Sequence, residues 1–509
     1  MKKTRLIICL LLALTLLCGC TAAQQTGSTA ATLPPATVNA EAPVGDDGMQ
    51  YNGQAALFLP SADGQRLLCR YVPVTLRHDV HPAQTIVQAL LGYDGDDTVQ
   101  PLGGETRLTL YGQNPVEVAG GVCTVDLTSS ALILEDETLY TACLAIATTL
   151  CNLSDIQEVN VLIADQAISM DISGNLPMGT LRGHSGEELT LLWEQMEARR
   201  TPLGGDASTV PVTSMATLYF PLADGSGVIP EVRTLTFPGQ TPQQLAAVLM
   251  TALSDGAQYV SGTAKMPDMD ALMTTSPQVS DMLEGGRLVT LNFTADLSTQ
   301  LDDCGIPMNC FLAAVTDTLM TFIPSVTAVK IQIGTEVLTQ TTSLTGAEIR
   351  FTDGVLRRSA FESFLMDQAV IYMAKDQKMV AVRRNLPAGD TASPRVLLKE
   401  MMQGATTQEQ DEGIQSILPE GLNEEDILGL SLQDDTLLIN LSAHAASAIR
   451  QAGSEREQLA CYGMVNTLCK SKNLRRVIFF FDGSSVNELA GSLDWGGSFF
   501  YCPGLIAKE

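Results

Sequence analysis

The same outline of a helix followed by a strand occurs three times along this chain, and it constrains the fold more than any other feature. The three stretches read "LAIATTLCNLSDIQEVNVLI" (144–163), "VTDTLMTFIPSVTAVKIQI" (315–333) and "YGMVNTLCKSKNLRRVIFFF" (462–481). Apolar residues spaced as on one helix face come first, and an apolar run typical of a buried strand follows. A threonine stands just before the end of each apolar stripe: Thr149, Thr318 and Thr467. This repetition predicts three related modules in tandem.

Each copy carries the same elements ahead of this helix. Two short strands joined by a turn are expected first, in segments that begin at Ala55, Met215 and Ala369. A helix follows, marked by a capping residue, a proline and a glycine, in "HPAQTIVQALLG", "TPQQLAAVLMTALSDG" and "SPRVLLKEMMQG". Next comes a strand with one polar position, which we expect to face the polar side of the sheet: Asp126, Asn292 and Asn440. Each unit therefore reads β-β-α-β-β-α-β, which predicts an α+β fold with the helices packed on one sheet.

The N-terminus has the features of a lipoprotein signal peptide. Basic residues precede an apolar run over 6–17, which is too short to span a bilayer comfortably. The run ends in "LLCGC", where the small residue Gly19 stands before Cys20. We therefore predict that Cys20 is lipidated, although an ordinary secretory signal with a chance cysteine is the alternative. Residues 21–49 contain few large apolar side chains and are expected to form a flexible tether.

Composition narrows the class of partner. The formal net charge is −27, which offers no electrostatic surface for nucleic acid. The same charge should be repelled by anionic lipid, so membrane attachment is expected to depend on the lipid at Cys20. The sequence therefore predicts an extracytoplasmic protein that is anchored to the cell membrane by lipid alone.

Nine cysteines follow Cys20, and an odd number argues against a complete disulfide framework. Cys143 and Cys151 lie too far apart along one predicted helix to bridge. Leu312 occupies the position of Cys143 in the second copy. We therefore expect these cysteines to act as small buried apolar side chains.

The repeated stretches resemble the GerMN domain, the sporulation and spore germination module of GerM-type lipoproteins. The resemblance is carried by "LYFPLADGSGVIPEVRTLTF" and "TPQQLAAVLMTAL" in the second copy, and by "ILPEGLNEEDILGLSLQDDTLLINLS" (417–442) and "VNTLCKSKNLRRVIFFFDG" (465–483) in the third. It implies a fold similar to the ring-building motifs of secretion systems and a role in assembling the complex between mother cell and forespore. Similar domains also occur in actinobacterial lipoproteins that partner a sensor kinase. Three copies, instead of one or two, depart from the GerM pattern.

The repeat and its spacers predict the domain organisation. We expect three GerMN-like domains joined by two linkers, the first of which holds an amphipathic helix within "EELTLLWEQMEARR". The predicted segments are a signal peptide with the lipidated cysteine (1–20), a tether (21–49), domain 1 (50–180), a linker (181–212), domain 2 (213–345), a linker (346–365), domain 3 (366–500) and a tail (501–509).

No arrangement of residues in the sequence indicates catalysis, a metal or a cofactor. The four histidines, His78, His81, His184 and His444, do not repeat between copies and lack partners at the spacing of metal ligands. Nucleophile, zinc-protease, redox and phosphate-loop motifs are all missing from the sequence. The Asp-Gly turns offer one carboxylate each, far fewer than a calcium loop needs.

We therefore expect a non-enzymatic scaffold or assembly factor in the cell envelope, linked through the resemblance to sporulation or germination. Its partner would be an envelope protein, such as a component of the sporulation channel or of the spore envelope. A solute-binding lipoprotein of a transport system is the main alternative, although such proteins usually enclose one cleft between two lobes. An exported hydrolase is the third.

Overall fold

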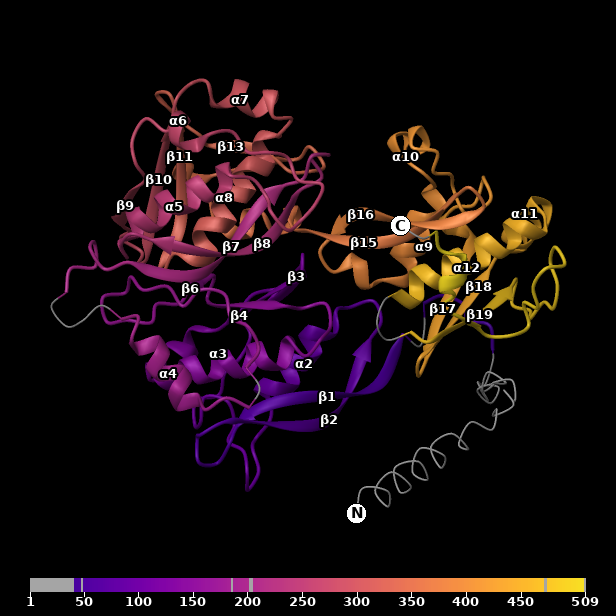
Figure 1. Cartoon of the computed structure of the whole chain (residues 1–509), viewed down its shortest axis with the longest axis horizontal. Coiled ribbons are helices and arrows are strands. Elements are labelled where there is room, and N and C mark those ends of the chain that lie inside the picture. The colour runs from indigo at the N-terminus through magenta and orange to yellow at the C-terminus, as the bar shows by residue number, and fades with distance from the viewer. Residues whose placement is uncertain (1–40, 47–48, 185, 201–204, 471–473, 508–509) are drawn as a thin grey trace, which may run out of the picture. The chain divides into compact units, whose positions relative to one another are not determined.

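Three modules with the same order of elements follow one another in the computed structural model (Figure 1). The structure describes residues 41–46, 49–184, 186–200, 205–470 and 474–507. Each module begins with an antiparallel hairpin and a helix, and it continues with a four-stranded sheet that is interrupted by a long helix. The predicted α+β fold with repeated modules is therefore confirmed.

Module 1 contains the strands and helices up to β6. They are β1 (Gln50–Pro60), β2 (Leu67–Arg77), α2 (Pro82–Leu91), β3 (Val116–Ala119), β4 (Val122–Leu127), α3 (Asp136–Leu150), β5 (Glu158–Ile163) and β6 (Gln166–Ala167). The amphipathic helix expected in the first linker is α4 (Leu189–Glu197), which turns Leu189, Leu192 and Met196 inward.

Module 2 repeats this order with two additional short helices. It contains β7 (Val212–Pro221), β8 (Val228–Phe237), α5 (Pro242–Ser254), α6 (Met269–Leu272), β9 (Gln278–Asp281), β10 (Arg287–Phe293), α7 (Leu297–Asp303), α8 (Met308–Phe322), β11 (Val326–Ile333) and β12 (Glu336–Val337). A separate hairpin of β13 (Gln340–Thr342) and β14 (Glu348–Arg350) follows and crosses the predicted boundary at residue 345.

Module 3 completes the series. It contains β15 (Met366–Lys375), β16 (Lys378–Pro387), α9 (Pro394–Gln403), α10 (Thr407–Asp411), β17 (Ile427–Gln433), β18 (Thr436–Leu441), α11 (Ala443–Ala452), α12 (Ser454–Lys470), β19 (Arg476–Phe481) and β20 (Phe499–Phe500). No helix in the described ranges is long and apolar enough to cross a membrane.

Each module has two sheets instead of the single sheet that the sequence predicts. The hairpin forms a sheet of its own, and the other strands form a four-stranded sheet, for example β3-β4-β5-β6. The two central strands of this sheet are parallel in every module, as in β4 with β5 and β18 with β19. This follows from the long helix between them, because a crossover connection returns the chain in the same direction. The short fourth strand was not predicted.

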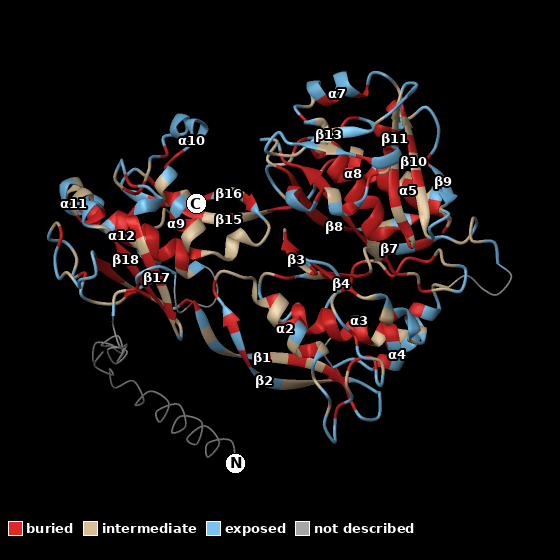
Figure 2. Ribbon diagram, turned by 180° about the vertical axis from the view of Figure 1, so that it is seen from behind, coloured by how far each residue is buried: buried red, intermediate tan, exposed pale blue. Residues whose placement is uncertain are grey.

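The long helix of each module lies between the hairpin and the four-stranded sheet. In module 2, α8 contacts β7 on one side and β11 on the other (Figure 1). Every residue from Cys310 to Phe322 is therefore buried, and Figure 2 shows α3 and α8 as almost continuously buried ribbons. The apolar stripe seen in the sequence describes only one of the two faces that are covered. A helix buried all round is typical of a middle layer.

The repeated threonine joins the long helix to the hairpin in all three modules. The Oγ1 atoms of the three threonines accept hydrogen bonds from backbone N–H groups of the first hairpin strand: Thr149 from Phe58 at 2.9 Å, Thr318 from Tyr219 at 3.0 Å and Thr467 from Tyr372 at 3.1 Å. A backbone N–H group that is withdrawn from water needs a hydrogen-bond partner, and the threonine hydroxyl supplies one at each of these three positions. The threonine thus satisfies an inward-facing strand edge.

The repeated polar strand position was expected to lie on the polar side of the sheet, but it is buried in two modules. Asp126 and Asn440 are buried, and each accepts a hydrogen bond from the turn after the closing strand. Asp126 Oδ2 accepts from the N–H of Asp165 at 2.9 Å, and Asn440 Oδ1 accepts from that of Gly483 at 3.0 Å. The loops that pack over this face were not visible in the strand pattern. Asn292 is only partly buried.

All nine cysteines beyond Cys20 are free thiols in the described part of the chain. Cys143 and Cys461 are fully buried, as is Leu312 at the matching position of module 2. Met320, which matches Cys151 and Cys469, is buried as well. The interpretation as small buried side chains therefore holds for Cys143 and Cys461, whereas Cys151 and Cys469 are only partly buried.

Described residues from both predicted end segments contact module 3. The N–H groups of Cys502 and Ala507 donate to Asn466 Oδ1 and to the carbonyl of Met379, both at 2.7 Å. Residues 43–46, which the sequence assigns to the flexible tether, pair with β17. Backbone pairing of this kind depends on an available strand edge, which composition does not reveal.

Candidate functional site

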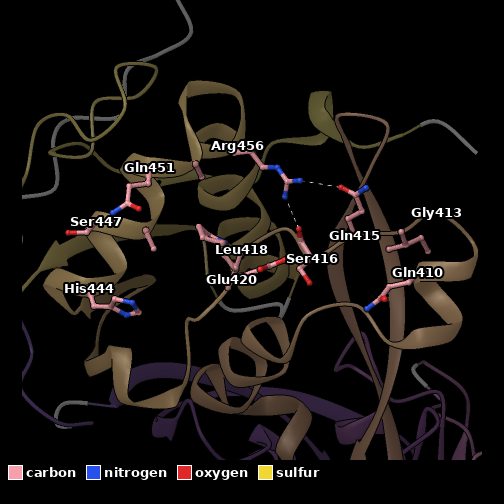
Figure 3. Close-up of a pocket in the computed structure, with 14 residues that line it drawn as sticks. Gln410, Gly413, Gln415, Ser416, Leu418, Glu420, His444, Ser447, Gln451 and Arg456 are labelled. Atoms are coloured by element: carbon pink, nitrogen blue, oxygen red, sulfur yellow. Dashed lines mark hydrogen bonds between the residues drawn. The ribbon is translucent and has the colours of Figure 1, made fainter.

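A polar groove of about 880 Å³ lies on module 3 (Figure 3). One wall is formed by α10 and the loop over 412–420, and the other by α11 and the start of α12. The lining side chains include three glutamines, two serines, Glu420, His444 and Arg456. A groove of this composition can offer many neutral hydrogen-bond donors and acceptors to a bound molecule.

The first wall is held in place by local features of the sequence. Thr406 and Glu409 form a reciprocal capping box at the start of α10. Gly413 then adopts a φ of 79°, a left-handed conformation that suits glycine, and the chain turns back toward the hairpin. Gln415 exchanges two backbone hydrogen bonds with Ala374 of β15, at 2.7 and 2.9 Å. The loop therefore joins the hairpin sheet as a short bridge.

Arg456 connects the two walls. Its Nη1 donates to the carbonyl of Ser416 and its Nη2 to Oε1 of Gln415, both at 3.2 Å (Figure 3). The side chain comes from α12, the helix that is packed between the two sheets of the module. The position of the loop is thus linked directly to the core.

His444 and Asp426 form the main charged contact beside the groove. His444 Nδ1 lies 3.0 Å from Asp426 Oδ1, and the imidazole is largely exposed. Burial by itself raises the pKa of Asp426, but hydrogen bonds from the Ser442 hydroxyl, the backbone N–H of Asn423 and His444 outweigh it and hold the pKa below its usual value. Asp426 is therefore ionised at neutral pH and orients the ring of His444.

The groove residues do not form a nucleophilic arrangement. Ser416 Oγ accepts a hydrogen bond from the N–H of Ala405 at 3.0 Å, so it serves the local backbone. His444 is bonded to Asp426, and the hydrogen bonds of the lining residues join no serine hydroxyl to its ring. The residues with described positions contain no group of three or more His, Cys, Asp or Glu that could hold a metal ion. The geometry suits recognition of a polar molecule.

A second concentration of ionisable groups lies where module 1 meets module 2. Arg358 is buried and donates to Glu117 of β3 and, at 2.8 Å, to Thr321 of α8. Asp317 is buried nearby, and Asp126 lies on the neighbouring strand β4. Burial raises the pKa of Asp317 and of Asp126 to about 7, although the charge of Arg358 opposes this shift. One cation therefore stabilises several carboxyl groups in the interior.

The predicted lipidation residue, Cys20, lies outside the described residues. The histidines that the sequence singled out serve separate local contacts. His78 is buried, which lowers its pKa to about 4. His81 caps α2 through Nδ1, and His184 pairs with Glu187 at 2.6 Å.

The sequence did not point to the groove. The one pattern that could have indicated the groove is the helical spacing of His444, Ser447 and Gln451, which share one face of α11. The opposite wall depends on how a loop folds back onto the hairpin, which has no comparable pattern.

Comparison with known families places the groove within a recognised domain. Residues 370–487 match the family model Germane, which is described as sporulation and spore germination.

Residues 370–487 are similar to the Germane family.

This domain spans most of module 3, from β15 to the loop beyond β19. No curated protein matches the chain.

Solved structures give weaker likenesses. The tandem GerMN domains of the sporulation protein GerM from Bacillus subtilis are 16% identical, cover 58% of this chain and 100% of their own, and have a TM-score of 0.22. A protein described as a lipoprotein from Clostridium perfringens is 21% identical, with coverages of 26% and 87% and a TM-score of 0.19. The first GerMN domain of the Bacillus subtilis protein is 14% identical, with coverages of 25% and 91% and a TM-score of 0.21. At these TM-scores the solved structures carry no argument, and the similarity to Germane applies to residues 370–487.

Proposed function

We propose that this protein is a lipid-anchored scaffold or assembly factor on the extracytoplasmic face of the cell membrane, working in sporulation or spore germination. The observation that carries the proposal is the Germane domain at 370–487, because its family is described by that process. The partner is an envelope protein, such as a component of the sporulation channel or of the spore envelope.

In the Germane domain the apolar side chains lie in the core and the polar ones line the groove, which agrees with a binding role. The apolar residues of the long helix α12 pack against both sheets of the module. The groove beside it is polar and lacks a nucleophile paired with a base. Such a surface can recognise another molecule through hydrogen bonds without changing it chemically.

The anchor follows from the N-terminal sequence. In this proposal Cys20 carries the lipid, and the strongly negative chain beyond it does not bind the membrane by charge. Cys20→Ser is expected to move the protein from the membrane fraction to the soluble extracytoplasmic fraction. Cys69→Ser is the matched control and should leave the protein in the membrane fraction. Equal membrane retention of the two variants would contradict the lipid anchor.

The scaffold role is tested by crosslinking and affinity purification of the tagged full-length protein from growing and from sporulating cells. We expect sporulation-channel or spore-envelope proteins to be enriched only in the second sample. An unchanged set of transporter subunits in both samples would contradict the proposal.

The groove favours one alternative, a solute-binding lipoprotein, because its volume and polar lining could hold a small polar molecule. A ligand of this groove should raise the melting temperature of the wild-type protein. Replacing Gln451 by a bulky residue, as in Gln451→Trp, should abolish that rise, whereas the same change at an exposed site of module 1, Gln113→Trp, should not. The alternative fails if no member of a panel of sugars, amino acids and short peptides shifts the melting temperature.

A further inference from the structure

Four residues just before module 1 lie along the edge of the sheet in module 3. Gly45 pairs in parallel with Gly429 of β17. The N–H of Gly45 donates to the carbonyl of Leu428 at 2.9 Å, and the N–H of Leu430 donates to the carbonyl of Gly45 at 3.1 Å. We call residues 43–46 the N-terminal segment. It extends the four-stranded sheet by one short strand, which is a recurring way for an extended peptide to bind.

Three residues of module 3 fit this segment closely. Gly429 has no Cβ, and a Cβ at this position would clash with the carbonyl oxygen of Pro43. Asn440 is buried and its Nδ2 donates to that same oxygen at 3.0 Å. Arg395 binds both carboxylate oxygens of Asp46, with Nε–Oδ2 and Nη2–Oδ1 distances of 2.5 and 2.6 Å. A fork-to-fork contact of this kind selects a carboxylate at one position.

The other modules lack this combination. The residue after the proline that opens the first helix is Arg395 in module 3, but Ala83 in module 1 and Gln243 in module 2. Asp126 takes the place of Asn440 in module 1, and a carboxylate cannot donate a hydrogen bond to a peptide carbonyl. The edge of β17 is thus a specific site for an extended segment with a carboxylate. This specificity comes from residues that the other modules lack, because the fold itself is shared by all three.

Apart from Pro43, which is buried, the segment binds through its backbone and one carboxylate. The side chain of Val44 is 80% exposed, so it contributes little apolar burial. The Asp46–Arg395 pair is also partly exposed to solvent. Contacts of this kind contribute little individually to stability, so the segment can leave the edge while the rest of the module remains folded.

We propose that the N-terminal segment of one copy also binds the β17 edge of a second copy, so that neighbouring molecules exchange their segments. The second copy is the occupant because its residues 43–46 carry the same backbone groups and the same carboxylate that fit this edge within one chain. Every contact described above can form between two chains as it does within one, and no further complementary surface is needed. Exchange of identical elements is a common route to dimers. The inference stands independently of any role in sporulation.

Variants with exchanged charges can distinguish contacts between two copies from contacts within one copy. In one tagged copy Asp46→Arg opposes Arg395 with a like charge, and in a differently tagged copy Arg395→Glu opposes Asp46. Neither chain can then form the ion pair within itself or with its own kind. When the two chains are mixed, both exchanged contacts join opposite charges. A photo-crosslinking amino acid at the exposed position 44 reports which chain the segment touches.

We expect the crosslinked dimer to be at least fivefold more abundant when the two full-length chains are expressed together than when either is expressed alone. Gly429→Val, added to both chains, should remove this gain because it blocks the approach of the segment. The doubly substituted chain, D46R with R395E, should return to the wild-type dimer level. All variants should keep the wild-type melting temperature within a few degrees, which shows that they fold. Equal dimer yields for the mixture and the separate chains, with crosslinks formed only within one chain, would overturn the proposal.

Discussion

Modules 1 and 3 place a polar side chain at the same point of the central strand, but its surroundings differ. In module 1 the residue is Asp126, whose Oδ2 accepts from the following turn while its buried Oδ1 has no hydrogen-bond partner among the described residues. In module 3 the residue is Asn440, whose amide accepts from the turn and donates to Pro43. The amide uses both of its polar atoms, whereas the carboxylate needs a proton or a cation. Modules with the same fold can therefore differ in how they respond to pH.

The two modules also use arginine differently. Arg358 is buried between modules 1 and 2, where it stabilises Glu117 and the nearby carboxyl groups. Arg395 of module 3 binds Asp46 at a site that is partly exposed to water. A buried partner that loses its counterion is left as an uncompensated charge, whereas an exposed partner is solvated again.

The largest effect is expected from Arg358→Met. This change leaves Glu117 and Asp317 without their cation in the protein interior, so it should destabilise the protein by about 3–5 kcal/mol. Thermal and urea unfolding at pH 7.5 would measure the loss. A cost below about 1 kcal/mol would mean that the buried cluster is solvated, and the contrast with Arg395 would then fail.

The second largest effect on stability is expected from Asp126→Asn, which places in module 1 the residue type that module 3 has at the matching position, Asn440. The folded-state pKa of Asp126 is about 7, above its ordinary value of 3.8, so the fold favours the protonated form. The contribution of Asp126 to the stability of the wild-type protein should therefore fall as the pH rises from about 4 to about 7, and then level off. Asp126→Asn removes this contribution, while that of Asp317 remains, and it should stabilise the protein by roughly 2 kcal/mol at pH 8, with little or no gain at pH 4.

Unfolding of the Asp126→Asn protein and the wild type across this pH range would test that difference. A constant difference at all pH values would show that Asp126 does not titrate in the fold. The reverse change, Asn440→Asp, places a carboxylate against the carbonyl of Pro43 and should destabilise module 3 most at high pH.

The threonine contacts test whether the modules are equivalent in their cores. Thr318→Val and Thr467→Val each leave a buried backbone N–H without a partner and should cost about 1–2 kcal/mol. Thr149→Val should cost less, because Phe58 is only partly buried and water can replace the hydroxyl. Melting temperatures of the three variants would give the order. If Thr149→Val lowered the melting temperature most, the difference in burial of the N–H groups would not explain the losses of stability.

The smallest effect is expected from Arg395→Ala. The pair with Asp46 is partly exposed, so its loss should cost at most about 1 kcal/mol in unfolding experiments. Hydrogen exchange should nevertheless become faster at the N–H of Leu430, which donates to Gly45. Unchanged exchange at that amide would show that the N-terminal segment stays bound without the ion pair.

Much of the fold was predictable from local patterns. The capping residues Thr241 and Ser393, each followed by proline, marked the starts of α5 and α9. The repeated threonine was visible as a pattern, but its role was not, because its partner lies in a strand far away in the sequence. Similarly, the i, i+3, i+7 stripe located α8 but could not show that the opposite face of this helix is covered by a second sheet.

The groove and the N-terminal segment were not predictable. Gln415 and Arg456 belong to different elements and meet only because the loop after α10 folds back onto the hairpin. Residues 43–46 have the composition of a linker, and they are ordered here by the edge of β17, which lies nearly 400 residues further along the chain, as shown by the separation of 397 between Pro43 and Asn440.

The sequence by itself determined the threefold repeat, the order of strands and helices and the acidic character of the chain, because each of these depends on residues that are close together in the chain. The tertiary structure alone decided which polar residues are buried, which arginine faces a buried carboxyl group and which sheet edge is occupied. The physical reason is that burial and pairing are properties of a position in space. Asp126 and Asn440 occupy matching places in the sequence pattern, but their chemistry is set by the loops and chain ends that pack over them.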